Sequence, residues 1–181
     1  MKGPGSRFPR TGPRIQLRRL SAKDLEPFQA YRHDPDVGRF QGWTPWPDEQ
    51  ALAFLQEMEK ASLFRPGTWC QIGIADRVSE RLIGDIGIHL DEKQNEAEIG
   101  FTLQAKSQGR GLGTEAVRAA IDWAFEMTEI LRVVSVTDSR NHSAIKLLER
   151  IGMQRFRTVK NVFKGQPCTE HLYRLNRSEG L

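Results

Sequence analysis

Apolar and polar residues recur along the chain with two different spacings, which predict strands and helices in alternation. Alternation at every second residue, or a short continuous apolar run between polar turns, is typical of a strand. Apolar residues three and four positions apart are typical of a helix. The strands are expected at 15–20, 69–75, 81–90, 96–103, 131–138, 153–163 and 168–175. The helices are expected at 21–32, 48–61, 112–127 and 141–152.

Local capping and turn signals indicate how these elements follow one another. Ser21 and Asp24 have the spacing of a capping box, which begins a helix, and Gly152 is typical of the residue just after a helix end. The polar segments DRVSE and DEKQN separate the three middle strands and predict antiparallel hairpins. About seven strands and four helices without an internal linker indicate a single α/β domain of the mixed α+β kind over residues 15–176.

The 181 residues carry a basic excess that is confined to the beginning of the chain, and the sequence pI is about 9.3. Residues 1–14 hold four basic residues and no acid, whereas the remaining 23 basic residues face 23 acidic ones. This Gly- and Pro-rich segment is expected to be a disordered tail, and residues 177–181 a second tail. Contact of the basic tail with RNA stays an alternative, but no pattern of interleaved aromatic and basic residues supports a nucleic-acid-binding module.

Composition argues against several other classes of protein. No run approaches the ~18 apolar residues of a membrane span, and no charged and then apolar leader opens the chain, so a soluble cytoplasmic protein is expected. Cys70 and Cys168 are too few for a disulfide framework, and the apolar stretch around Cys70 favours a buried thiol. No residues have metal-ligand spacing, so no metal is expected.

The segment QGRGLGTE at residues 108–115 places three glycines directly before a predicted helix. A helix N-terminus presents unpaired N–H groups and a partial positive charge, and glycines let an anion approach the backbone. The segment therefore predicts an anion site, most often one for phosphate, although a turn that only begins a helix would have the same residues. The alternating glycines and the Thr114 that follows them match neither a Walker loop nor a dinucleotide-binding fingerprint.

Residues 108–113, QGRGLG, resemble the Gln/Arg-x-x-Gly-x-Gly/Ala motif of the GNAT acetyltransferase superfamily. AEIGFTLQ at 97–104 resembles the strand before that motif, and GTEAVRAAIDWAFE resembles the helix after it. LIGDIGIHL resembles the preceding strand, and Asn141 with AIKLLERIGM resembles the later Asn…Gly-Phe segment, with Met153 in place of Phe. The ordered set spans residues 14–176 and is most similar to the ribosomal-protein N-acetyltransferase (RimJ/RimL-like) branch.

The resemblance implies acetyl-coenzyme A as the acetyl donor. It implies that backbone N–H groups of Arg110 to Thr114 bind the pyrophosphate, and that the sheet splays between the 96–103 and 131–138 strands to admit pantetheine. It also implies that Asn141, which is placed to cap a helix as well, contacts the pantetheine arm. The implied coenzyme-binding residues are Phe101, Thr102, Leu103, Gln108, Gly109, Arg110, Gly111, Leu112, Gly113, Thr114 and Asn141.

Acetyl transfer requires a neutral amine placed close to the thioester carbon and a donor for the oxyanion. Glu98 is the first candidate for the base, because strand alternation places it with Gly100 and Thr102 on one face and partial burial would raise its pKa. Asp85 on the neighbouring strand is the second. Alternatively, Glu98 is an exposed charge at a strand edge, and Asp85 caps a turn. His89 titrates in a suitable range but is expected to be a surface residue.

The leaving thiolate has no obvious proton donor in the sequence. The resemblance implies a tyrosine as general acid in the helix that follows Asn141, and Leu148 occupies that position. Ser143 is nearby in sequence, but its direction is open. No general acid is therefore assigned, and the thiolate is expected to leave unassisted or to be protonated by water.

The turn-rich segment 33–47 is expected to bind the acceptor, with Phe163 closing the opposite wall. The two tryptophans of this segment would alternatively cover a hydrophobic core, as tryptophans between helices often do. The expected acceptor-binding residues are His33, Arg39, Trp43 and Trp46.

The sequence thus predicts an N-acetyltransferase that transfers the acetyl group to a primary amine by direct attack in a ternary complex. The branch favours a protein N-terminal α-amino group. A small amine (an aminoglycoside, a polyamine or an amino acid) stays an alternative, because four acids lie near the acceptor segment. An alternative of another class is a non-catalytic acyl-coenzyme A-binding regulator. A homodimer stays open, since dimers are common in similar proteins. The four acids are Asp34, Asp36, Asp48 and Glu49.

Overall fold

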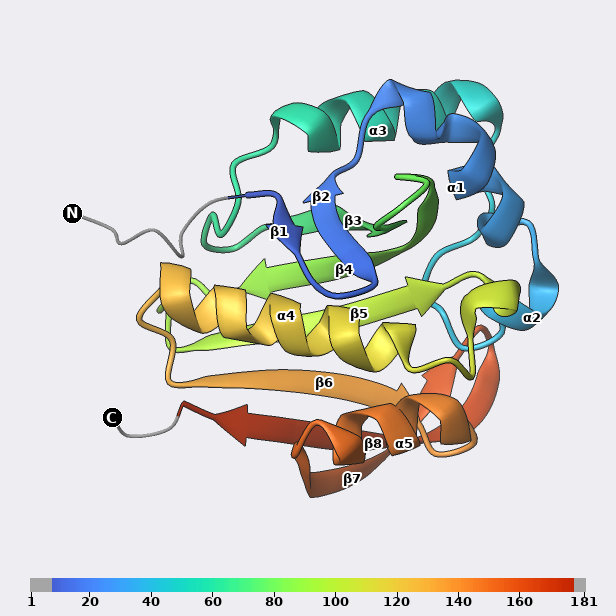
Figure 1. Ribbon diagram of the computed structural model, residues 1–181. Helices are drawn as coiled ribbons and strands as arrows, with labels where there is room; N and C mark the ends of the chain where they lie inside the picture. The colour runs from blue at the N-terminus through green and yellow to red at the C-terminus, as the bar shows by residue number, and fades with distance from the viewer. Residues whose placement is uncertain (1–7, 178–181) are drawn as a thin grey trace.

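The computed structural model describes residues 8–177, which form an eight-stranded sheet with helices packed against it (Figure 1). The strand order is β1-β2-β3-β4-β5-β6-β8-β7, and neighbouring strands are antiparallel except for the parallel pair β5 and β6. The strands are β1 (Arg10–Thr11), β2 (Ile15–Arg19), β3 (Trp69–Asp76), β4 (Leu82–Leu90), β5 (Glu96–Leu103), β6 (Arg132–Asp138), β7 (Gln154–Phe163) and β8 (Gln166–Asn176).

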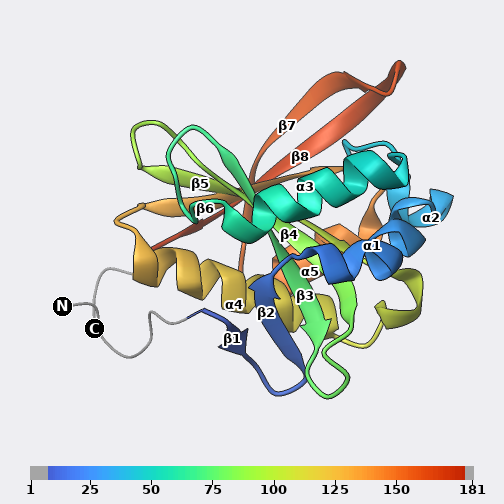
Figure 2. The same ribbon diagram turned by 90° about the horizontal axis from the view of Figure 1, so that it is seen from above.

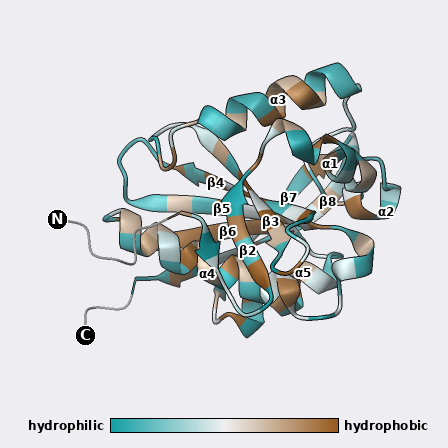
Figure 3. Ribbon diagram, turned by 45° about the horizontal axis from the view of Figure 1, so that its top comes forward, coloured by the Kyte–Doolittle hydropathy of each residue, from teal (hydrophilic) through white to brown (hydrophobic). Residues whose placement is uncertain are grey.

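The helices enclose two separate hydrophobic cores. The larger core joins α4 and α5 to the central strands around Trp123 and Ile86, and the smaller core lies between α1, α3 and Leu82. Figure 2 shows α1 and α3 next to each other, and Figure 3 shows that the helices carry both hydrophobic and hydrophilic residues, as helices that cover a sheet do. The helices are α1 (Leu25–Arg32), α2 (Pro35–Gly38), α3 (Asp48–Lys60), α4 (Leu112–Met127) and α5 (His142–Arg150).

The predicted fold class is confirmed, and all seven predicted strands and four predicted helices occur. Apart from the 3-10 turn Ala105–Ser107, one strand and one α-helix were not predicted, namely β1 with two residues and α2 with four. Both are shorter than the window in which hydrophobic periodicity becomes visible. Gly152 follows the end of α5 with a φ of 93°, the left-handed conformation expected just after a helix.

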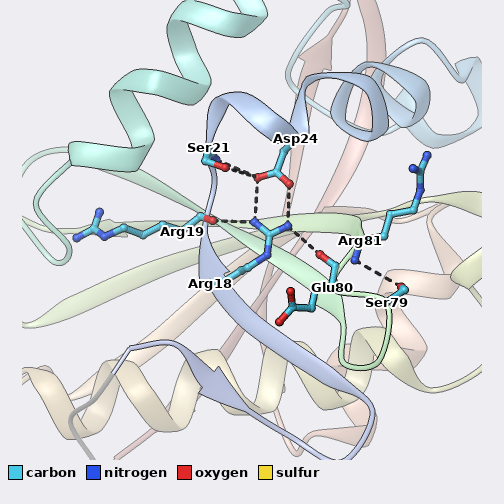
Figure 4. Close-up of polar contacts among 7 residues, drawn as sticks. All are labelled: Arg18, Arg19, Ser21, Asp24, Ser79, Glu80 and Arg81. Atoms are coloured by element: carbon cyan, nitrogen blue, oxygen red, sulfur yellow. Dashed lines mark hydrogen bonds and ion pairs between the residues drawn. The ribbon is translucent and has the colours of Figure 1, made fainter.

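The predicted capping box is present between β2 and α1 (Figure 4). The Asp24 carboxylate accepts a hydrogen bond of 2.9 Å from the Ser21 backbone N–H, and Arg18 forms an ion pair of 2.7 Å with the same carboxylate. Arg18 also donates to the Glu80 carbonyl, so the β3–β4 turn is joined to the same cluster. The box begins a 3-10 turn at 22–24, and the α-helix proper starts at Leu25.

The N-terminal segment differs from the expected tail. Residues 8–14 pack on the domain: Phe8 stacks on Trp123 with ring centroids 4.7 Å apart, and Arg10 pairs with β2 at Leu17. The aromatic and ionic contacts of this segment hold it in place, although its Gly, Pro and basic composition is typical of disorder. The remaining tail expectation, for residues 1–7 and 178–181, lies outside the described residues, whereas Arg177 donates to the Ile130 carbonyl.

Both cysteines, Cys70 and Cys168, are free and buried, as expected for Cys70. Over residues 8–177, no helix is both long and apolar enough to cross a membrane. In the same part of the chain, no cluster of three or more His, Cys, Asp or Glu side chains is arranged to hold a metal ion.

Candidate active site

A cavity of about 460 Å³ opens where β5 and β6 separate. The two strands pair only over Glu96–Glu98 and Arg132–Val134, so the expected splay in the sheet is present. Beyond it, Gly100–Leu103 line one wall of the cavity and Ser135–Thr137 the other. The remaining walls come from the glycine loop, from α5 and from residues around α2.

The free edge of β5 directs backbone polar groups into this opening. Ser135 Oγ donates to the Ile99 carbonyl at 2.9 Å, and Gln41 Nε2 donates to the Phe101 carbonyl at 3.1 Å. Because N–H and C=O of one strand residue point to the same neighbour, the N–H groups of Phe101 and Leu103 also face the cavity. The edge can therefore pair with an extended polar chain, as the family resemblance implies for pantetheine.

The glycine loop brings backbone to the cavity at the start of α4. Gly109 and Gly111 have φ values of 71° and 77°, in the left-handed region that favours glycine, and Gly111 is the N-cap of α4. Gly113 and Thr114 line the cavity with them. The first N–H groups of a helix lack partners within it and carry a partial positive charge. An anion site and a free strand edge thus border one cavity, which fits a pyrophosphate joined to an extended arm.

Two of the implied coenzyme-binding residues, Leu112 and Arg110, are not among the residues that line the cavity, and a third, Gln108, lines it but also has a structural contact. The Leu112 side chain is buried in the larger core. Arg110 does not line the cavity, and its charge contributes, after hydrogen bonds from Ser79, to lowering the pKa of Asp76. Gln108 lines the cavity, and its Nε2 donates to the Leu103 carbonyl at 2.8 Å, which ties the loop to the end of β5.

Asn141 has the predicted capping role and also borders the cavity. Its Oδ1 accepts a hydrogen bond of 3.2 Å from the Ala144 N–H, so it caps α5, and the residue also lines the cavity. Ser143 lines the cavity as well. Leu148 is fully buried in the larger core, so the position of the implied tyrosine does not reach the cavity.

Glu98 lies at the edge of the opening. It is the last β5 residue that pairs with β6, and it stands opposite His89 on β4. Glu98 does not line the cavity itself, but Gly100, two residues further on the same face, does. Partial burial raises the pKa of the Glu98 carboxyl; the charge of His89 opposes this shift, and Glu96 and Glu170 add to it.

Asp85 has a structural role instead of the predicted catalytic one. Its side chain is 1% exposed, and the Tyr31 hydroxyl and Arg32 Nη2 both donate to its Oδ2, the latter at 3.1 Å. Gln71 Nε2 donates to Oδ1 at 2.9 Å. Burial raises the pKa of the Tyr31 hydroxyl well above its usual value, and the charge of Asp85 adds to this shift. The hydroxyl therefore stays protonated and donates to Asp85. The carboxylate joins α1 to β4 and is shielded from an incoming amine.

The acceptor segment borders the cavity through residues other than the predicted ones. Trp43 and Trp46 pack against the smaller core, and Trp46 contacts Phe54 edge-to-face, so the alternative interpretation of the tryptophans is the better one. His33 and Arg39 do not line the cavity either. The residues that do are Asp36, Val37, Phe40 and Gln41.

The sequence interpretation missed two basic residues of α5, Lys146 and Arg150, which line the cavity. Their spacing of four residues places them on one face of a helix, and they line the same cavity as the glycine loop. That spacing was a readable signal, but only the packing of α5 shows that this face borders the cavity. Phe163, the expected second wall, is half-buried and does not line it.

Comparison with known proteins identifies the family. The family model described as acetyltransferase (GNAT) domain matches residues 14–154. The chain belongs to the GNAT acetyltransferase family. It is 29% identical over 144 residues to the uncharacterized N-acetyltransferase p20 of Bacillus licheniformis, covering 78% of this chain and 80% of p20. It is also 26% identical over 164 residues to the uncharacterized N-acetyltransferase YoaA of Bacillus subtilis, and the match covers 88% of this chain and 92% of YoaA.

Solved structures share the whole fold. The crystal structure of a GNAT family acetyltransferase from Bacillus anthracis superposes with a TM-score of 0.82 at 21% identity, covering 94% of this chain and 98% of that one. GNAT members use acetyl-coenzyme A, so the chain is an acetyl-coenzyme A-dependent acyltransferase of the N-acetyltransferase class. The putative ribosomal N-acetyltransferase YdaF of Bacillus subtilis is 38% identical over 72 residues, which cover 39% of this chain and 39% of YdaF, in line with the resemblance to the RimJ/RimL-like branch.

Proposed function

We propose that this GNAT enzyme acetylates the α-amino group of a protein N-terminus. The amine attacks the thioester of acetyl-coenzyme A directly, within a ternary complex in the opening between β5 and β6. The observation that carries the proposal is the cavity itself, which joins the glycine loop, the free edge of β5 and the residues around α2. The glycine loop and the residues around α2 would bind the two substrates at opposite ends of this cavity.

The coenzyme end is assigned to the glycine loop and the β5 edge. Backbone N–H groups at Gly111, Gly113 and Thr114 would hold the pyrophosphate, and the backbone of Phe101 to Leu103 would pair with the pantetheine arm. Asn141 would contact the same arm. Acetyl-coenzyme A supplies the activated acyl group, and this chain's residues orient it and stabilise the oxyanion. The Phe101 N–H, which faces the opening, is the proposed oxyanion donor.

Glu98 is the proposed base. Its raised pKa brings the carboxylate closer to the range in which it can accept a proton from an ammonium group near neutral pH. An α-amino group has a pKa of about 8 and a lysine one of about 10.4, so a single shifted carboxylate suits the former better. A water molecule can relay the proton, since Glu98 lies beside the cavity and not in its wall. The thiolate leaves without an assigned acid.

The charges around the acceptor end favour an N-terminus over a polyamine. Of the four acids near the acceptor segment, only Asp36 is among the described residues that line the cavity. Asp34 accepts from the Asp36 N–H at the start of α2, and Asp48 accepts from Gln29 Nε2 at 2.8 Å, so both have local roles. A polycationic acceptor would need several free carboxylates, whereas one carboxylate is sufficient for a single α-ammonium group.

Solved neighbours act on both kinds of acceptor. RimL, named as a ribosomal L7/L12 α-N-protein acetyltransferase, superposes with a TM-score of 0.80 at 13% identity. The spermidine N-acetyltransferase of Vibrio cholerae superposes with a TM-score of 0.76 at 16% identity. A small amine therefore stays the second candidate, for which Asp36 is the supporting observation. The alternative of another class, a non-catalytic acyl-coenzyme A-binding regulator, is not proposed, because the chain belongs to a family of acetyltransferases.

A thiol-release assay with matched acceptors tests the proposal. The panel contains a peptide with a free α-amino group, the same peptide with a blocked N-terminus and a free lysine, spermidine, an aminoglycoside and free amino acids. The expected result is release with the free α-amino peptide and little with its blocked counterpart. Faster release with spermidine or an aminoglycoside would establish the small-amine alternative. Calorimetric binding of acetyl-coenzyme A without release on any acceptor of the panel would contradict both acceptor classes.

A further inference from the structure

Arg14, at the turn between β1 and β2, touches the backbone of the glycine loop. Its Nη1 donates to the Arg110 carbonyl at 2.8 Å, one residue before the left-handed Gly111. A Cβ added to Gly111 would lie 3.3 Å from Arg14 Nη2, so the guanidinium lies directly behind the loop. The side chain is 53% exposed. The N-terminal segment thus reaches the proposed pyrophosphate site from outside the cavity.

The same arginine is joined to the first turn of α4 through Glu115. Arg14 Nε forms an ion pair of 2.9 Å with Glu115 Oε2. Glu115 Oε1 accepts from the backbone N–H groups of Arg14 at 2.8 Å and Ile15 at 3.2 Å. A Cβ on Gly12 would lie 2.7 Å from that oxygen, so the turn is fitted closely around the carboxylate. Loop, helix and turn are therefore held by one charged cluster.

We propose that Arg14 and Glu115 form a latch that positions the glycine loop for the pyrophosphate, with Arg14 as a positioning residue. The proposal rests on the coenzyme site proposed above. The latch fixes the carbonyl of Arg110 while the following N–H groups point to the cavity. It also neutralises a carboxylate that would otherwise oppose an anion in the first turn of α4, where the helix is partly positive.

A second ion pair of the same segment provides a matched control. Arg10 pairs with Glu126, near the other end of α4, with Nη2 2.9 Å from Oε1. The two glutamates are eleven residues apart, about 16 Å along the helix at 1.5 Å per residue. Both arginines hold the same segment on the same helix, and among the hydrogen bonds described for residues 8–177 the one to the loop comes from Arg14. Removing the Arg10–Glu126 ion pair therefore measures how much KM changes when the segment is held less firmly on α4 without any change at the glycine loop.

The test compares Arg14→Gln with Arg10→Gln on two acetyl donors. Acetyl-coenzyme A carries the pyrophosphate, whereas S-acetylpantetheine lacks it. Arg14→Gln is expected to raise the KM for acetyl-coenzyme A about three- to tenfold, the range of one typical lost hydrogen bond, with kcat retained. Its kcat/KM with S-acetylpantetheine should stay within about twofold of wild type. Arg10→Gln should leave both donors unchanged.

An equal loss with both donors, or the same KM increase in Arg10→Gln, would overturn the latch. Arg14→Lys keeps the charge beside Glu115 but cannot make both side-chain contacts, so an intermediate KM is expected. If Arg14→Gln does not fold, Arg14→Lys provides the test, and a wild-type KM for acetyl-coenzyme A in Arg14→Lys contradicts the latch. Failure of the proposed coenzyme site looks different, because wild type would then use acetyl-coenzyme A no better than S-acetylpantetheine.

Discussion

At the scale of single residues, Glu98 and Asp85 show how two acids on neighbouring strands acquire different roles. Both were predicted as candidate bases, Glu98 from strand alternation and partial burial and Asp85 from its place on the neighbouring strand. The structure buries Asp85 under α1, where Tyr31 and Arg32 hold it, and leaves Glu98 half-buried beside the opening. The sequence places both acids on one face correctly, but the helix that covers one of them comes from tertiary packing.

Glu98→Gln is expected to lower kcat/KM about 100-fold at neutral pH, the usual contribution of a positioned general base. Because the pKa of Glu98 is raised, wild-type activity should fall as pH drops through that raised value, and the variant should lose this acid limb. The pH profile of kcat/KM measures both. Glu96→Gln is the control: it retains the base and removes a charge that raises the pKa of Glu98, so its acid limb should move to lower pH. A normal profile in Glu98→Gln would exclude Glu98 as the base.

The same variant has a stability signature. A carboxyl group whose folded pKa is raised contributes stability that is present below its usual value of 4.5 and is lost as pH rises through the folded pKa. Glu98→Gln should therefore be more stable than wild type at pH 7 to 8, and the difference should disappear near pH 4. Thermal unfolding at the two pH values checks this. A variant that is less stable than wild type at pH 8 contradicts the assigned burial.

Asp85→Ala is expected to destabilise the fold by about 3–5 kcal/mol, because it leaves the Arg32 charge buried without its partner. The Arg32 side chain is 5% exposed. Urea unfolding measures the loss, and Glu26→Ala is the control, since the Glu26–Arg81 pair is largely exposed and contributes little. A change in Asp85→Ala as small as that of the control would show that the buried cluster is not needed for stability.

At the scale of elements, the long strands and helices were predictable, because hydrophobic periodicity is visible over eight or more residues. The short helix α2 was not, although it supplies the neighbourhood of Asp36 and Gln41 at the acceptor end. Asp34 caps it and Pro35 begins it, a signal that is local and easily taken for a turn. The splay between β5 and β6 was expected only from the family resemblance, because spacing does not show where two paired strands separate.

Helix α5 carries the next prediction. Lys146→Gln combined with Arg150→Gln is expected to weaken acetyl-coenzyme A binding about tenfold at low salt, because two cations next to the cavity attract its phosphates. The difference from wild type should shrink as salt rises. Calorimetric titration at two ionic strengths measures this, and Lys60→Gln on α3 is the control. An unchanged affinity at low salt would place the phosphates away from α5.

At the scale of the whole molecule, the N-terminal segment becomes part of the domain. Composition alone indicated a tail, because four basic residues with Gly and Pro are typical of disorder. The structure instead pairs Arg10 with Glu126 and Arg14 with Glu115, so two of the basic charges are used within the fold. This use of charge also weakens the alternative of a nucleic-acid-binding tail.

Phe8→Ala is expected to lower the free energy of unfolding by roughly 1–2 kcal/mol, because Phe8 loses its stacking on Trp123 and part of its burial. Val78→Ala, at a side chain that is 93% exposed, should change it by less than about 0.5 kcal/mol. Chemical denaturation of the two variants and wild type measures these free energies of unfolding. Equal stability of Phe8→Ala and wild type would mean that the segment behaves as the tail that its composition suggests.

The central claim is that acetyl-coenzyme A binds in the opening between β5 and β6, and calorimetric titration of Gly100→Leu tests it most directly. A Cβ at Gly100 would meet no atom within 4 Å, and the residue lines the cavity, so leucine fills the opening while the fold is retained. Gly42→Leu, also in open space but outside the cavity, is the control. The account predicts that Gly100→Leu abolishes measurable binding while Gly42→Leu binds like wild type. Undiminished binding in a folded Gly100→Leu protein would contradict it.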